Sequence, residues 1–154
     1  MKKLIIILLT IHFSQFTIGQ EMTESAVTFN HIALSVKDAD QSAEFYKKSL
    51  NLKEITNKTE IDGIRWLSLG GGIELHLISI PDDEIKTNKA VHFAVTTADF
   101  DSSIKNLKSM KIVYSDWTAE TPYKINIRTD GIKQVFFQDP NGYWIELNSI
   151  GTKN

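Results

Sequence analysis

The clearest alternation of hydrophobic and polar positions in the chain lies between Gln134 and Asn148. Two runs of aromatic and β-branched residues there flank the tetrapeptide Asp139-Pro140-Asn141-Gly142. Proline presets φ for a turn, and Asn-Gly supplies the positive φ that closes it. The pattern therefore predicts a β-hairpin, whose second strand places every other residue on the same face. On one face lie Trp144, Glu146 and Asn148, and on the other lie Tyr143, Ile145 and Leu147.

Glu146 is an acidic residue between two hydrophobic ones in the middle of the second strand. A buried carboxylate without a partner would destabilise the fold by several kcal/mol, so this side chain must lie on a solvated face or be held by a cation. A bound metal ion is the explanation that we favour.

A repeat is visible when the sequence around His31 is aligned with the sequence around His92. Each histidine begins an alternating strand and is followed seven residues later by an aspartate, Asp38 or Asp99. Each aspartate precedes hydrophobic residues spaced three or four apart, which is the pattern of a capped amphipathic helix. The predicted helices run from Asp38 to about Leu50 and from Asp99 to about Met110.

The later part of each repeat corresponds as well. Asp62-Gly63 matches Asp130-Gly131, each a hairpin turn that leads into a strand, and Ile73-Glu74-Leu75 matches Ile145-Glu146-Leu147. The sequence therefore predicts an α+β fold of two βαβββ modules, each with a helix packed on a mixed or antiparallel sheet. The modules span about 27–80 and 89–150, and the second is longer around 111–129.

The first twenty residues have the features of a secretory signal peptide. Lys2 and Lys3 precede an apolar run from Leu4 to Leu9, and a polar stretch with small residues follows. The apolar run is too short to span a membrane, and no second one follows it. We therefore expect a periplasmic or secreted protein, with residues 21–154 in one domain and no membrane insertion after cleavage. A buried N-terminal strand is the alternative, which fits the Lys-Lys start less well.

Charge and cysteine content narrow the function further. Removal of residues 1–20 takes away two lysines and no acidic residue, so the formal net charge changes from −2 to −4. An acidic domain of this kind is a poor partner for nucleic acid. Because the chain has no cysteine, an exported form has no disulfide and must depend on its core or on a metal for stability.

Four side chains of metal-ligand type occupy equivalent positions in the two modules. His31 and His92 lie at the start of the first strands, and Glu74 and Glu146 lie in the last strands. Two neutral imidazoles and two carboxylates suit one divalent ion, Zn²⁺, Ni²⁺, Co²⁺, Mn²⁺ or Fe²⁺, and leave positions for water or substrate. Either histidine alone could be a hydrogen-bonded strand residue without a ligand role. Their equivalence in the repeat, each with a glutamate, favours the metal site.

His76 shares the face of Glu74 and has several possible roles. It could donate a hydrogen bond to a ligand, act as a general base, replace Glu74 as ligand, or make a purely structural polar contact. Asn148 takes its place in the second module. Trp144, on the face of Glu146, is a further candidate for the substrate pocket.

Arg128 precedes the second Asp-Gly turn and has aromatic neighbours in the sequence. An arginine in such surroundings could bind a substrate carboxylate, or it could be an exposed loop residue. Arg65 and Trp66 admit the same two interpretations.

From roughly Val27 to Ile150 the chain resembles the glyoxalase, bleomycin-resistance and extradiol-dioxygenase superfamily, also called vicinal oxygen chelate (VOC) proteins. The segments that carry the resemblance are FNHIALSVKDADQSAEFYKKSL, GIELHLI, AVHFAV and DPNGYWIEL. The resemblance implies two modules paired into a cup-shaped sheet that binds one divalent metal, with His31, Glu74, His92 and Glu146 at the ligand positions. It also makes a homodimer plausible.

Strand alternation assigns side chains to the two faces of such a cup. The concave face would carry His31, Ala33, Ser35, Glu74, His76, Ile78, His92, Ala94, Thr96, Trp144, Glu146 and Asn148. The convex face, under the helices, would carry Ile32, Leu34, Val36, Leu75, Leu77, Phe93, Val95, Ile145 and Leu147.

The ligand set resembles that of glyoxalase I, which implies a lyase/isomerase acting on a small carbonyl compound through a metal-stabilised enolate. Glu146 or Glu74 would be the catalytic base. One alternative is a non-haem iron dioxygenase using His31, His92 and Glu146, although Glu74 would then occupy a position that O₂ needs. The other is a non-catalytic, metal-independent small-molecule-binding protein of the bleomycin-resistance kind.

Overall fold

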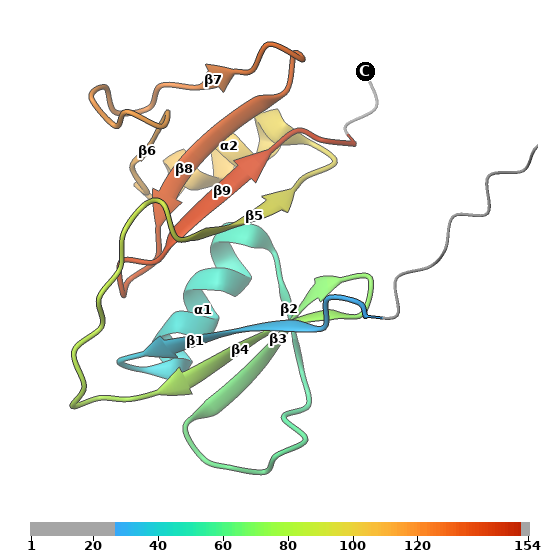
Figure 1. Cartoon of the computed structure of the whole chain (residues 1–154), viewed down its shortest axis with the longest axis vertical. Coiled ribbons are helices and arrows are strands. Elements are labelled where there is room, and N and C mark those ends of the chain that lie inside the picture. Colours follow the sequence, from blue (N-terminus) through green and yellow to red (C-terminus); the bar gives the residue numbers. More distant parts are fainter. Residues whose placement is uncertain (1–26, 152–154) are drawn as a thin grey trace, which may run out of the picture.

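The computed structural model describes residues 27–151, and the predicted signal peptide lies outside this range. Figure 1 shows two modules joined by an extended linker. The first contains β1 (His31–Val36), α1 (Ala39–Leu50), β2 (Lys53–Ile55), β3 (Ile64–Gly70) and β4 (Ile73–Ser79). The second contains β5 (His92–Thr96), α2 (Phe100–Ser109), β6 (Tyr114–Ser115), β7 (Asn126–Ile127), β8 (Lys133–Gln138) and β9 (Trp144–Asn148). The predicted α+β fold of two βαβββ modules is confirmed, and the extra β7 lies where the second module is longer.

Each module has its own hydrogen-bonded sheet. In the first the strand order is β1-β4-β3-β2, and in the second it is β5-β9-β8-β6, with β7 also paired to β8. The first and last strands of each module are parallel, and the other pairs are antiparallel. The predicted single cup-shaped sheet is thus divided into two sheets in this chain, with β1 and β5 at their edges. Among the described residues, no helix is long and apolar enough to cross a membrane.

The helix starts follow from local sequence. The side chain of Asp38 accepts hydrogen bonds from the backbone N–H groups of Asp40 and Gln41, at 2.9 Å each. The side chain of Asp99 accepts one from the backbone of Ser102, at 2.9 Å. Both predicted caps are confirmed, because an aspartate at this position satisfies N–H groups that the first turn leaves unpaired.

The core lies between the sheets and the helices. The residues predicted for the convex face are buried or packed against the buried cluster, which also includes the helix residues Ala43, Tyr46, Ile104 and Leu107. Leu75, Leu77 and Ile145 are fully buried. Hydrophobic alternation in the strands therefore determines which side of each sheet the helix covers.

The Asp139–Gly142 turn joins the two modules. Its aspartate is only 6% exposed and accepts a 2.9 Å hydrogen bond from the hydroxyl of Tyr46 in α1. The same carboxylate accepts from the backbone N–H groups of Asn141 and Tyr143, at 2.8 and 2.9 Å. Gly142 has a φ of 88°, the conformation that the Asn-Gly pair was predicted to supply. The predicted hairpin turn is confirmed, and it has a second role that its sequence did not indicate.

Asn141 extends this junction. Its side-chain oxygen accepts from the backbone N–H of Lys37 at 2.8 Å, and its amide nitrogen donates to the hydroxyl of Ser42 at 2.9 Å. Both partners lie at the beginning of α1. The turn of the second module therefore holds the first module at its helix N-terminus.

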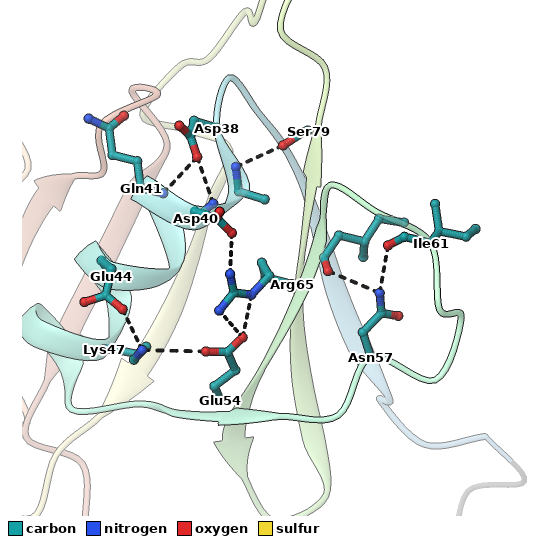
Figure 2. Close-up of polar contacts among 12 residues, drawn as sticks. Asp38, Asp40, Gln41, Glu44, Lys47, Glu54, Asn57, Ile61, Arg65 and Ser79 are labelled. Carbon is teal, nitrogen blue, oxygen red and sulfur yellow. Dashed lines mark hydrogen bonds and ion pairs between the residues drawn. The ribbon is translucent and has the colours of Figure 1, made fainter.

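The exposed side of α1 carries an ion-pair network, shown in Figure 2. Arg65 on β3 pairs with Glu54 on β2 at 2.5 Å and with Asp40 on α1. Lys47 bridges Glu54 and Glu44, at 3.6 and 2.6 Å. Hydrogen bonding by Arg65 lowers the pKa of Glu54. Arg65 therefore holds α1 against β2 and β3 through these contacts. Its neighbour Trp66 lies on the opposite face of β3.

Candidate functional site

The first module brings His31, Glu74 and His76 side by side. His31 on β1 lies directly opposite Glu74 on β4 in the parallel register. The ring of His76 stacks between His31 and Trp66, with centroid separations of 4.4 and 4.0 Å and interplanar angles of 12° and 6°. His76 Nε2 is 2.8 Å from Glu74 Oε2. The structure thus places two of the predicted pocket residues, His76 and Trp66, next to two of the predicted ligands.

The second module pairs the other two predicted ligands. His92 Nε2 is 3.6 Å from Glu146 Oε2, and the side-chain amide of Asn148 donates to Glu146 Oε1 at 2.9 Å. Trp144 is the register partner of His92. The edge of the His92 ring also meets the ring of Phe136, with centroids 5.4 Å apart. Asn148 is therefore the counterpart of His76, since each donates to the glutamate of its own module.

The hydrogen-bond partners fix which ring nitrogen carries the proton in each histidine. His31 Nδ1 lies 2.7 Å from the side-chain oxygen of Asn30, and His92 Nδ1 lies 2.9 Å from the backbone oxygen of Lys89. Because a carbonyl oxygen can only accept, both Nδ1 atoms are donors, and in the neutral ring Nε2 keeps a free lone pair. This is the state that ligating histidines adopt. In His76 it is Nε2 that donates, to Glu74, which suits a supporting residue rather than a ligand.

The four predicted ligands nevertheless form two separate pairs. No group of three or more His, Asp or Glu side chains able to hold a metal ion is present in residues 27–151. Figure 1 shows β1 and β5 running in opposite directions, so that the two strands begin on different sides of the view. The donor types fit a divalent metal, but their placement within one chain does not fit a four-ligand site.

Arg128 lies at the turn between β7 and β8. Its guanidinium donates to the carboxylate of Asp130 at 2.7 Å, and its side chain is 40% exposed. Its contacts in the described structure therefore correspond to the exposed loop interpretation, and none joins it to the four predicted ligands.

Sequence reasoning missed Lys89, in the linker before β5. Its ammonium lies 4.8 Å from the ring centroid of Phe136, 4.5 Å from that of Trp144 and 5.6 Å from that of Trp117. Burial lowers the pKa of Lys89, and the charge of Asp116 partly offsets this effect. Strand parity could have found Phe136, which lies opposite Glu146 in the register, but nothing periodic in the linker indicates Lys89.

A cavity of about 430 Å³ adjoins these aromatic side chains. Phe136 and Trp144 form part of its wall, together with Phe45, Tyr114, Ser115 and Gln138. Two of the rings that surround Lys89 therefore also line a space large enough for a small organic molecule.

A family model described as the Glyoxalase/Bleomycin resistance protein/Dioxygenase superfamily matches residues 28–147. The chain belongs to this superfamily. Glyoxylase I 4 of Arabidopsis thaliana is 27% identical over 126 residues, which cover 78% of this chain and 69% of the plant protein. This member of the VOC superfamily is thus a distant relative of that protein.

Solved structures show the same fold. A glyoxalase/dioxygenase from Nostoc punctiforme superposes with a TM-score of 0.63 at 26% identity, covering 79% of this chain and 90% of the other. Oxidase ChaP-H1 superposes with a TM-score of 0.67 at 22% identity, covering 80% and 96%. At the latter identity the likeness concerns the fold alone, and it leaves the reaction of this VOC protein open.

Proposed function

We propose that this protein is an exported, metal-dependent, glyoxalase-like lyase/isomerase that acts on a small carbonyl compound. Membership of the superfamily and the distant relation to Glyoxylase I 4 support this class. The observation that carries the proposal is the equivalence of the two modules. Each presents a histidine whose Nδ1 is engaged as a donor, at His31 and His92, next to a glutamate that is itself hydrogen-bonded.

A complete ligand set requires both modules, and one chain keeps its two His–Glu pairs apart. β1 and β5, which carry the histidines, are edge strands, and an edge strand can pair with a strand of another chain. We therefore propose that the protein works as a homodimer, in which the first module of one copy faces the second module of the other. In that arrangement His31 and Glu74 of one copy would complete the site begun by His92 and Glu146 of its partner.

The chain's own contribution to the reaction would be proton transfer by a glutamate. Glu146 has one carboxylate oxygen held by Asn148, while the other faces His92. Glu74 is held in the same way by His76. A carboxylate fixed through one oxygen is oriented for its other oxygen to take a proton from a carbon next to a carbonyl group. Either Glu146 or Glu74 is therefore the proposed base.

The experiment that tests this function measures metal content, oligomeric state and turnover. The mature protein, purified natively, should contain about one divalent metal per chain and behave as a dimer, since a dimer would hold two shared sites. Elemental analysis and light scattering measure both. Turnover of an α-hydroxy or α-keto carbonyl compound with Zn²⁺, Ni²⁺ or Co²⁺ under anaerobic conditions supports the lyase/isomerase.

Three other outcomes would contradict the proposal. Turnover only with Fe²⁺ and O₂ would identify a dioxygenase instead. Ligand binding without turnover or metal would identify a binding protein. Recovery of the protein from the cytoplasm with residues 1–20 still attached would contradict export.

A substitution of His76 can show whether this residue orients the predicted ligand Glu74 or makes only a structural contact. His76→Phe keeps a ring between His31 and Trp66 but removes the N–H that Glu74 accepts. We expect the metal affinity to fall by about 10- to 100-fold, the usual effect of losing a residue that orients a ligand. Metal titration of the variant measures this. Unchanged affinity, with the stack intact by circular dichroism of the aromatic region, would show that His76 makes a structural contact only.

A further inference from the structure

Lys89 places a positive charge on the face of the second sheet that carries His92 and Glu146. Its ammonium lies within 6 Å of three ring centroids, and at such distances a cation is attracted by the ring faces. The linker lysine therefore belongs to the same face of the molecule as the second His–Glu pair.

The hydrogen bonds of the ammonium leave one donor for a ligand. An ammonium has three N–H groups, and Lys89 donates to the backbone oxygens of Asp116 and Trp117, at 2.7 and 2.8 Å. Both acceptors lie at the start of the long loop between β6 and β7. Lys89 is thus held in place by two neutral acceptors and three rings, and the carboxylate of the nearby Asp116 forms its ion pair with Lys124, at 2.7 Å.

The neighbouring cavity supplies room for the rest of a ligand. It has a volume of about 430 Å³ and is lined by Phe136 and Trp144, the two rings nearest to the ammonium. Flat aromatic walls stack well against a planar ring. A second cation would be repelled by Lys89, whereas an anionic oxygen would gain a charge-assisted hydrogen bond from it.

We propose that this aromatic site binds small planar carboxylates that carry an aromatic or conjugated ring. The ring lies against Trp144 and Phe136, and the carboxylate accepts a hydrogen bond from Lys89. The walls of the cavity include the register partners of Glu146 and His92, Phe136 and Trp144, but not the four predicted ligands themselves. The inference rests on the proposed function in one respect, because it takes this cavity as the place where the substrate of that function binds and names the substrate class as aromatic oxo or hydroxy acids. Binding itself requires neither a metal nor turnover.

The test uses phenylglyoxylate as a probe, with the mature full-length protein in the presence of a chelator. 1-Phenylpropane-1,2-dione has the ring and two adjacent carbonyls without the charge, and pyruvate has the charge without the ring. Isothermal titration should show that phenylglyoxylate binds more tightly than either. Lys89→Met should lower the affinity for phenylglyoxylate by about tenfold or more, as expected for the loss of a hydrogen bond to a charged group. The affinity for the dione should not change.

Two further variants serve as controls. Lys86→Met removes the same charge from an exposed lysine of the same linker, whose ion pair is with Glu84, and should leave all three probes unaffected. Trp144→Leu should lower the affinity for both ring-containing probes and leave the affinity for pyruvate unchanged. If Lys89→Met fails to fold, the comparison of phenylglyoxylate with the dione on the unaltered protein still tests the charge.

Failure of this inference can be told from failure of the proposed function. Three results would overturn the inference, even if another carbonyl compound were turned over with metal. Lys89→Met and Lys86→Met could bind phenylglyoxylate equally well, pyruvate could bind as tightly as phenylglyoxylate, or phenylglyoxylate could fail to bind. Ring- and charge-dependent binding without any turnover would support the inference and contradict the enzyme.

Discussion

Asp139→Ala should lower the free energy of unfolding by about 3 kcal/mol or more, because each buried donor left without an acceptor costs about 1–3 kcal/mol. The carboxylate accepts from the hydroxyl of Tyr46 and from the backbone of Asn141 and Tyr143, and it is almost fully buried. Alanine would leave these donors without acceptors inside the module junction. Urea denaturation followed by circular dichroism measures the loss.

The matched control is Asp130→Ala, which removes the aspartate of another tight turn in the same module. Asp130 is 51% exposed and pairs with Arg128 at the surface, so its removal should change the free energy of unfolding by about 1 kcal/mol or less. Equal losses for the two variants would mean that the Asp139 turn does not hold the modules together.

Tyr46 provides an independent test of the same junction through pH. Burial, and then the charge of Asp139, raise the pKa of Tyr46 well above its ordinary value of 10.0. A raised folded-state pKa means that the stabilising contribution is complete below the unfolded pKa and is lost as the pH rises through the folded one. The unaltered protein should therefore lose stability above about pH 10, and Tyr46→Phe should lose less over that interval.

The parts of the fold that the sequence predicted correctly are those determined by neighbours along the chain. Asp38 and Asp99 cap helices because each side chain reaches N–H groups two or three residues later. The alternation of Ile145 and Leu147 with Glu146 identifies the buried face because strand side chains alternate by geometry. The repeat then transfers each assignment from one module to the other.

The position of one module relative to the other could not be predicted in this way. The contact between Tyr46 and Asp139 joins residues 93 positions apart, and neither hydrophobic period nor turn chemistry specifies it. The same limit applies to the candidate site. Each His–Glu pair forms between neighbouring strands of one module. Whether the two pairs come together in one site depends on which edge strands lie next to each other. A repeat is equally compatible with pairing inside one chain and with pairing between two chains.

The linker shows a second limit. Lys89 reaches Trp117 and Phe136 through the path of a segment without helix or strand, and sequence alone does not define such a path. Trp117 lies in the long insertion of the second module, where the repeat offers no counterpart. Aromatic residues and a lysine are individually common, and only the folded chain brings them together beside His92.

Single substitutions of the two histidines should each abolish tight metal binding. Loss of a supporting residue typically lowers metal affinity by about 10- to 100-fold, so loss of His31 or His92 as a ligand should cost more than about 100-fold. Asn148→Ala, which removes only the hydrogen bond to Glu146, should have a smaller effect. Equal effects of His92→Ala and Asn148→Ala in metal titrations would mean that the ligand set is wrong.

The His31→Ala and His92→Ala variants should recover metal binding when they are combined in one dimer. In a dimer with shared sites, a His31→Ala chain contributes an intact second module and a His92→Ala chain contributes an intact first module. Together they form one complete site and one doubly defective site. A mixed dimer isolated through two different affinity tags should therefore hold about half of the metal per chain that the unaltered dimer holds.

A site within one chain gives the opposite result, because each chain of the mixed dimer would still lack one histidine and no metal would return. Failure to isolate any mixed dimer, with the unaltered protein monomeric by light scattering, would exclude the shared site altogether. Restoration to half would locate the site between β1 of one copy and β5 of the other, since these edge strands carry the histidines that complement each other.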